Sequence, residues 1–192
     1  MLAYLNIVQL IASEDVSHEE KGTGMKTRRT WMLLAVVAVV LGLTMQAQAL
    51  DSKPVLSLEI AKKMADACET MAKAEGWNLN IAIVDAGADL LLFRRMPNAF
   101  LGSVEIAIDK AKTSSRFPFP TRAIANIAYG EDGKGGRVPG IVHVDGIMAF
   151  AGGLPIKAGD TLIGAIGTSG ATADQDEQCA QAGIDAVADM LK

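Results

Sequence analysis

The sequence predicts an α+β fold: a single domain with an antiparallel sheet of about five strands packed by helices. Helix-like and strand-like segments follow one another in the order helix, two strands, two helices, about three strands, helix. Short turns join the strand segments, and such turns connect antiparallel neighbours. The 192 residues suffice for one domain with a good core once an N-terminal signal is set aside.

The first helix is expected from Leu58 to about Glu75. Ser57 precedes it and can accept a hydrogen bond at the helix start, and Gly76 is suited to end it. Four side chains recur at helical spacing and form its buried stripe: Ile60, Met64, Cys68 and Met71.

A β-hairpin is expected next. Residues 80–85 and 90–95 have strand character, and residues 86–89 between them have turn chemistry. Arg94 and Arg95 end the second strand, and alternation places them on opposite faces of the sheet. Each is read either as a solvated strand end or as a guanidinium that binds a ligand carboxylate.

Two further helices are expected in the middle of the chain. The first begins at Ser103 and carries Lys110 near an apolar face, from which a lysine side chain ordinarily extends to water. Phe-Pro-Phe-Pro at residues 117–120 ends this helix and supplies two large rings. Thr121 is expected to cap the second helix, which runs to Tyr129.

Residues 131–140 are charged and rich in glycine, which predicts a mobile surface loop. Its glycines do not follow a strand, so we do not interpret it as a phosphate-binding loop. Residues 141–145 are expected to form a strand with His143 and Asp145 on one face, and residues 147–150 follow after a turn at Gly146.

Two strands and a helix complete the predicted domain. Residues 154–156 and 161–167 are strand-like on either side of a turn at residues 158–160. The glycines of the second strand predict close approach of a second molecule or of a helix of the same chain. Thr172 and Gln175 fit a capping box at the start of a helix from Ala173 to Leu191. Its inward residues are expected to be Ile184, Val187, Ala188 and Leu191.

Acidic residues begin this last helix. Asp174, Asp176 and Glu177 fall in its first turn, where the helix dipole favours negative charge. Asp174 and Glu177 also share a helix face, so metal binding is an alternative. The helix start already explains both carboxylates, and we predict no metal site.

Residues 25–49 have the parts of a secretory signal peptide. A basic start at 25–29 is followed by an apolar run at 31–44 and an Ala-Gln-Ala cleavage site at 47–49. The apolar run is shorter than the roughly 20 residues that span a bilayer, so we expect cleavage and no stable membrane anchor. The mature protein is expected to begin at Leu50 and to be periplasmic or secreted, by general or twin-arginine export.

Residues 1–24 are expected to be a mis-assigned upstream leader, with Met25 as the true start. Glu20-Lys21-Gly22 requires purine-rich codons, which resemble a bacterial ribosome-binding site just before a start codon. The domain then covers residues 50–192. The net charge of −4 and the lack of a basic tract in the domain argue against nucleic-acid binding.

Few residues suited to metal or redox chemistry remain in residues 50–192. His143 is the only histidine there, and closely spaced cysteines and histidines of the zinc-binding type are absent. Cys68 and Cys179 are the only cysteines, each on an expected helix among apolar neighbours. They could pair after export, but we favour the alternative of two small buried thiols.

Four short motifs are similar to those of a known family. They are Ala-Ile-Asp-Lys-Ala-Lys-Thr at 107–113, Gly-Gly-Leu-Pro-Ile at 152–156, Ile-Gly-Ala-Ile-Gly-Thr-Ser-Gly at 163–170 and Thr-Ala-Asp-Gln-Asp-Glu at 172–177. Over about residues 54–192 the chain therefore resembles the GlcG/HbpS-like haem-binding (haem-degrading) domain family. The resemblance implies the same α+β architecture, homo-oligomers and haem as a cofactor that is sequestered or degraded.

Two functions remain open. The first is haem binding, which requires apolar walls, a cation for the propionates and an axial ligand, for which exclusion leaves His143 as the strong nitrogen donor. The second is a small-molecule enzyme or sensor on the same fold that binds an organic acid.

The family motif adds Lys110 and Thr113 to the candidate site, and no catalytic residue is assigned. Candidate walls are Phe93, Phe117, Phe119, Met148 and Phe150. Candidate cofactor-binding residues are His143, Lys110, Thr113, Arg94, Phe117 and Met148.

Overall fold

The structure, a computed structural model, describes residues 52–192. The predicted leader and signal peptide, and the predicted mature N-terminus at Leu50, lie outside the described residues. Within that range the predicted α+β fold is confirmed, with an antiparallel sheet of four strands where about five were expected. No helix of the described part is long and apolar enough to cross a membrane.

The sheet has the strand order β2-β1-β4-β3, and every neighbouring pair is antiparallel. The strands are β1 (Asn80–Asp85), β2 (Leu90–Arg95), β3 (Gly153–Ala158) and β4 (Thr161–Ser169). The predicted hairpin β1–β2 has the predicted bounds. Pro155 lies in the edge strand β3, where the missing N–H of proline is tolerated.

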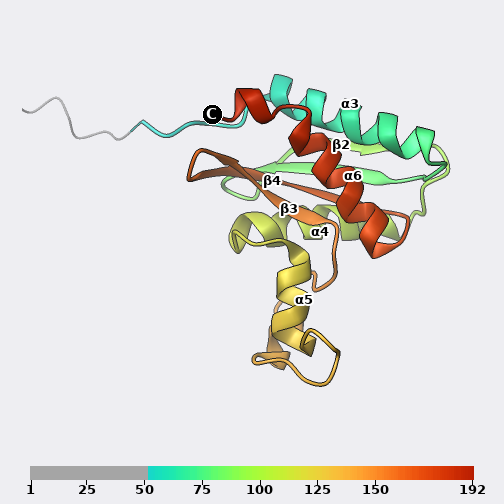
Figure 1. Cartoon of the computed structure of the whole chain (residues 1–192), viewed down its shortest axis with the longest axis vertical. Helices are drawn as coiled ribbons and strands as arrows, with labels where there is room; N and C mark the ends of the chain where they lie inside the picture. The colour runs from blue at the N-terminus through green and yellow to red at the C-terminus, as the bar shows by residue number, and fades with distance from the viewer. Residues whose placement is uncertain (1–51) are drawn as a thin grey trace, which may run out of the picture. The chain divides into compact units, whose positions relative to one another are not determined.

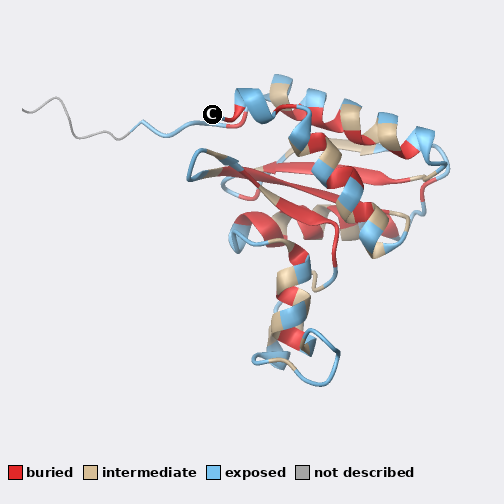
Figure 2. Ribbon diagram, in the orientation of Figure 1, coloured by how far each residue is buried: buried red, intermediate tan, exposed pale blue. Residues whose placement is uncertain are grey.

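Two helices cover one face of the sheet, and one covers the other (Figure 1). Helices α3 (Leu58–Ala74) and α6 (Ala173–Asp185) lie side by side on the first face, and α4 (Ser103–Arg116) lies on the second. Figure 2 shows the buried residues concentrated in the sheet and on the helix faces turned toward it. Ser57 accepts a hydrogen bond from Ile60 N, and Thr172 and Gln175 form the predicted capping box.

The core between the sheet and the pair α3–α6 contains a disulfide. Cys68 on α3 and Cys179 on α6 are fully buried and bonded, with Cα atoms 4.7 Å apart. The prediction of two buried thiols was therefore wrong. The close packing of α6 against α3 depends on Gly183 of α6, because a Cβ at this position would lie 3.0 Å from the carbonyl oxygen of Met64 in α3.

The core on the α4 face is built from small side chains. A Cβ added to Gly167 of β4 would lie 2.2 Å from the carbonyl oxygen of Ala107 and 2.4 Å from the amide nitrogen of Ala111, both in α4. The glycine of this strand therefore accommodates a helix of the same chain, which was one of the two alternatives that the sequence left open.

The missing fifth strand corresponds to residues 141–150. A 3₁₀ helix η1 (Pro139–His143) stands where residues 141–145 were expected to be extended, and residues 147–150 form no strand. Local hydrogen bonds satisfy this backbone, from Ile141 N to Val138 O and from Val144 N to Ile141 O. The prediction that His143 and Asp145 share one face of a strand was wrong, because neither residue belongs to the sheet.

The C-terminal helix is shorter than expected. Helix α6 ends at Asp185, and a second 3₁₀ helix, η2 (Ala188–Met190), precedes the last residues. Val187 and Leu191 are buried as predicted, but Ala188 is exposed.

Residues 117–152 leave the body of the domain after α4 and return to it at β3; we call this segment the arm. Its helix α5 (Thr121–Tyr129) extends away from the sheet in Figure 1. Pro120 rather than Thr121 precedes the first turn, and Thr121 is the first helical residue. Backbone hydrogen bonds from Gly135 N to Tyr129 O and from Val138 N to Ile127 O hold the following loop against α5.

Candidate functional site

A buried ion pair lies where helix α4 meets the returning end of the arm. Lys110 is fully buried, and its Nζ lies 2.7 Å from Asp176 Oδ2 on α6. The same nitrogen donates to the carbonyl oxygen of Thr168 at 3.0 Å and lies 4.6 Å from the centroid of the Phe150 ring. The expectation that the lysine extends to water was wrong, because α6 places a carboxylate beside it.

The electrostatics of this pair are set by burial and by mutual attraction. Burial lowers the pKa of Lys110 below 10.5, and the hydrogen bond to Asp176 opposes that shift. Burial likewise raises the pKa of Asp176 above 3.8, opposed by Lys110 and by the N–H of Ala171, which donates to Asp176 Oδ1 at 3.0 Å. The pair therefore stabilises the two charges only while both partners are present.

Two threonines hold the same returning segment. The buried Thr113 hydroxyl donates to the carbonyl oxygen of Gly146 at 3.2 Å and accepts from the N–H of Met148 at 2.9 Å. Thr121 at the start of α5 accepts from the N–H of Gly153 at 2.9 Å. Residues 146–153 thus lie along α4 and are fixed to the helices by side-chain contacts.

The structure brings Lys110, Thr113 and Met148 together and places Phe117 and His143 elsewhere on the arm. Lys110 and Thr113 lie one helical turn apart on α4, and Thr113 binds the backbone of Met148. Phe117, 37% exposed, begins the arm. The exposed His143 lies in η1, also on the arm.

Arg94 is not part of this group. It lies on the opposite face of the sheet, where its Nη1 binds Asp66 at 2.8 Å and Glu69 at 2.7 Å, both on α3. Two carboxylates of the same chain therefore already neutralise the guanidinium for which the sequence suggested a ligand carboxylate.

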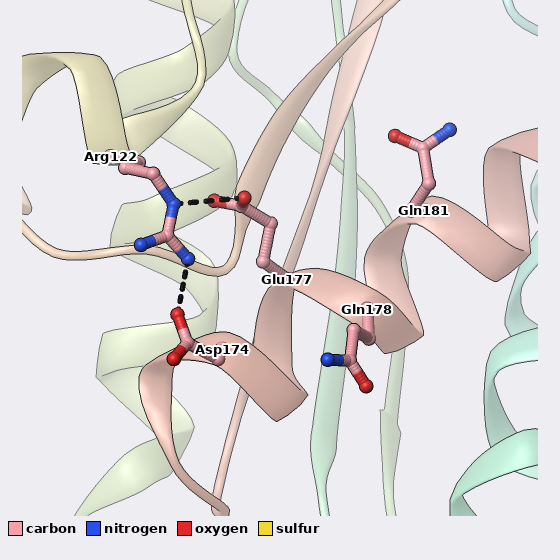
Figure 3. A pocket seen from close by; sticks show the side chains of 5 residues that line it. All are labelled: Arg122, Asp174, Glu177, Gln178 and Gln181. Carbon is pink, nitrogen blue, oxygen red and sulfur yellow. Dashed lines mark hydrogen bonds and ion pairs between the residues drawn. The ribbon is translucent and has the colours of Figure 1, made fainter.

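A polar pocket of about 360 Å³ lies between α5 and α6 (Figure 3). Arg122 of α5 donates from Nε to Glu177 at 3.0 Å and from Nη2 to Asp174 at 2.6 Å. The guanidinium thus supplies the positive partner of the two carboxylates that the sequence raised as a metal pair. The described residues contain no group of three or more metal-ligating side chains. Gln178 and Gln181 complete the lining.

Sequence reasoning missed the roles of Asp176 and Thr121. Asp176 was interpreted only as a first-turn acid of α6, and Thr121 only as a helix cap. The partner of Asp176 lies 66 residues earlier in the chain, so no local spacing connects the two. A lysine within an otherwise small and apolar helix face was the one available signal, since such a lysine requires a buried counter-charge when it is covered.

Comparison with known proteins shows which protein family the chain belongs to. Residues 56–185 match the family described as haem degrading protein HbpS-like, and the chain belongs to this family. The family that the sequence motifs suggested is thereby confirmed.

Similar proteins cover the domain almost completely. An uncharacterized 15.0 kDa protein from the dhaT-dhaS intergenic region of Citrobacter freundii is 32% identical over 137 residues, which span 70% of this chain and 94% of that protein. A crystal structure of a double mutant of HbpS from Streptomyces reticuli has a TM-score of 0.65 and 30% identity, over 73% of this chain and 92% of that one. The crystal structure of a PduOC–haem complex has a TM-score of 0.63 and 27% identity, over 69% of this chain and 95% of that one.

Proposed function

We propose that this protein binds haem through the arm, outside the cytoplasm, and that it sequesters the cofactor. The observation that carries the proposal is the similarity to PduOC, whose structure is a haem complex and which this chain matches over 95% of its length. Membership of the HbpS-like family, described as haem degrading, supports the same ligand.

The exposed apolar surface of the arm fits a macrocycle. Six of the twelve exposed large hydrophobic side chains of the described residues belong to the arm, although it is a short part of the domain. They are Phe117, Phe119, Tyr129, Val138, Val144 and Phe150. A haem requires apolar protein walls, and we propose that side chains from this set provide them.

The donor groups on the arm also fit haem. His143 is exposed beside the exposed Val144, and the phenol of Tyr129 is exposed on the same arm. Imidazole and phenolate are both axial ligands that proteins use for haem iron. Among the competing sulfur ligands, Met96 is buried and both cysteines are in the disulfide, whereas Met148 is half-buried on the arm and less accessible than the exposed His143. We propose His143 as the ligand, while Lys110 and Thr113 act from behind the surface by holding residues 146–153.

Export and assembly are part of the proposal. The Cys68–Cys179 disulfide supports an oxidising compartment, which agrees with the predicted signal peptide. The family resemblance and the exposed side chains of Phe100 and Leu101 on the body support a homo-oligomer. Intact mass of the exported protein tests cleavage before Leu50, and light scattering at micromolar concentration tests assembly; a retained signal peptide or a monomer contradicts the respective claim.

A haemin titration followed by absorbance tests the ligand. The parent protein is expected to give a saturable Soret shift, and His143→Ala to lose the low-spin spectrum and bind more weakly while circular dichroism stays unchanged. Asp145→Ala is the matched control, because Asp145 is an exposed neighbour that leaves the imidazole in place. Absence of any saturable shift in the parent, with thermal stabilisation by organic acids instead, would refute haem binding and support the small-molecule alternative. An unchanged spectrum in His143→Ala would remove His143 as ligand and make Tyr129→Phe the next variant.

A further inference from the structure

We propose that Lys110 is a positioning residue for Phe150: the buried ammonium fixes the ring, and through it residues 146–153, as one wall of the ligand-binding surface. The ligand role of that surface rests on the function proposed above. Lys110 itself contacts no ligand, because it is fully buried.

The first argument concerns the partners of the ammonium group. An ammonium has three N–H donors, and oxygen acceptors are provided by only two groups, Asp176 Oδ2 and the carbonyl of Thr168. The face of the Phe150 ring lies 4.6 Å away and provides the third favourable contact. A charge that has lost its water depends on each of its partners, so the position of the ring is coupled to the ion pair.

The second argument is the path of the backbone beside the lysine. A Cβ on Gly152 would lie 2.7 Å from Lys110 Nζ, and a Cβ on Gly153 would lie 2.5 Å from the carbonyl oxygen of Lys110. The two glycines therefore allow the chain to pass directly against the lysine. Gly152 also has a φ of +121°, which residues with a side chain rarely adopt, so both its conformation and its packing require glycine.

The third argument is that Phe150 remains accessible. Its exposed fraction is 39% although the ammonium lies against the ring, so part of the side chain is available to a ligand. The threonine contacts at Gly146, Met148 and Gly153 fix the backbone on both sides of the ring. The threonines hold only the backbone of this segment, whereas Lys110 contacts the exposed aromatic side chain of Phe150 itself.

Two measurements on protein purified after expression of the whole chain test the proposal. The first is hydrogen–deuterium exchange of residues 146–153 without any ligand. Lys110→Met and Phe150→Leu are each expected to accelerate exchange there several-fold, whereas Lys73→Met, which breaks a surface ion pair with Glu69 on the other side of the sheet, leaves it unchanged. Unchanged exchange in Lys110→Met would overturn the proposal. If Lys110→Met does not fold, the charge-balanced pair Lys110→Met with Asp176→Asn takes its place.

The second measurement is haemin affinity in a double-mutant cycle. Lys110→Met and Phe150→Leu are each expected to weaken binding about tenfold, which is within the range of a desolvated cation–aromatic contact. The combined variant is expected to be no weaker than either, because the lysine acts through the ring. Additive losses would overturn the positioning role. If the parent does not bind haemin, the proposed function fails, and the exchange measurement alone decides whether Lys110 positions Phe150.

Discussion

Reduction of the Cys68–Cys179 disulfide is expected to cost a large part of the stability of the domain. The two cysteines are separated by 111 residues, and chain-entropy arguments assign a cross-link over a loop of this length about 4.8 kcal/mol of stabilisation. Both sulfur atoms stay in the core after reduction, so the comparison of oxidised and reduced protein isolates the cross-link from a cavity effect. Domains of this size have free energies of unfolding of about 5–15 kcal/mol, so the cross-link supplies from about a third to nearly all of the stability.

Urea denaturation followed by the fluorescence of Trp77 measures the effect. With a slope of about 2 kcal/mol/M, the midpoint of the reduced protein is expected about 2 M below that of the oxidised protein. Cys68 and Cys179 are fully buried, so the protein must be unfolded and refolded in reductant for complete reduction. The control is Cys68→Ala/Cys179→Ala, whose midpoint should not respond to reductant.

Two outcomes would refute the reasoning. Free thiols detected by alkylation and mass spectrometry in the protein purified without reductant would show that the bond does not form. A midpoint shift below about 0.5 M on full reduction would show that the long loop contributes little, either because the denatured chain is already restricted or because the native bond is strained.

Three further predictions concern single side chains. Lys110→Met leaves the Asp176 carboxylate buried without its partner and should lower the free energy of unfolding by about 3–5 kcal/mol, measured by urea denaturation; a loss below about 1 kcal/mol contradicts the buried pair. Gly167→Ala places a Cβ against the backbone of α4 and should cost about 3 kcal/mol, so an unchanged thermal midpoint would show that α4 can move away. Glu69 has a pKa held below 4.5, first by its hydrogen bond to Lys73, so its contribution is complete above pH 4.5 and is lost as the pH falls through its folded-state pKa. Glu69→Gln should therefore flatten the acid side of the stability profile by about 0.5–1 kcal/mol, and identical profiles would contradict this.

The fold was predictable where local chemistry and tertiary packing agree. The β1–β2 hairpin was predicted with its bounds, because two largely apolar segments flank a turn that Gly87 stabilises by donating to Asp85 Oδ1. The start of α6 was predicted because its capping box is a local interaction. The turn of the hairpin and the capping box each depend on residues within four positions of one another.

Residues 141–145 show where local patterns fail. The apolar alternation around His143 is compatible with a strand, but a strand requires a neighbour, and this segment lies on the arm away from every sheet edge. Pro139 in the first turn fits the 3₁₀ helix that forms instead. Alternation reports side-chain character, and the fold decides whether a partner strand is present.

The candidate site was predictable in its residue types but not in its contacts. Lys110 and Thr113 were identified through the family motif, yet their partners come from α6 and from residues 146–150. The disulfide could not be inferred for the same reason, since it depends on α3 and α6 lying side by side. Long-range juxtaposition is a property of the assembled sheet and its helices.

The arm enters and leaves the domain beside the same helix. It departs at the end of α4, and Gly153 returns against the backbone of Lys110 in that helix. The disulfide, the four strands and the three helices of the body all lie outside residues 117–152. Insertions, deletions or new side chains along most of the arm would therefore leave the scaffold undisturbed, so the ligand surface can change on an unchanged frame. The exception is the short stretch beside α4, where a longer side chain at Gly152 or Gly153 would disturb arm and frame together.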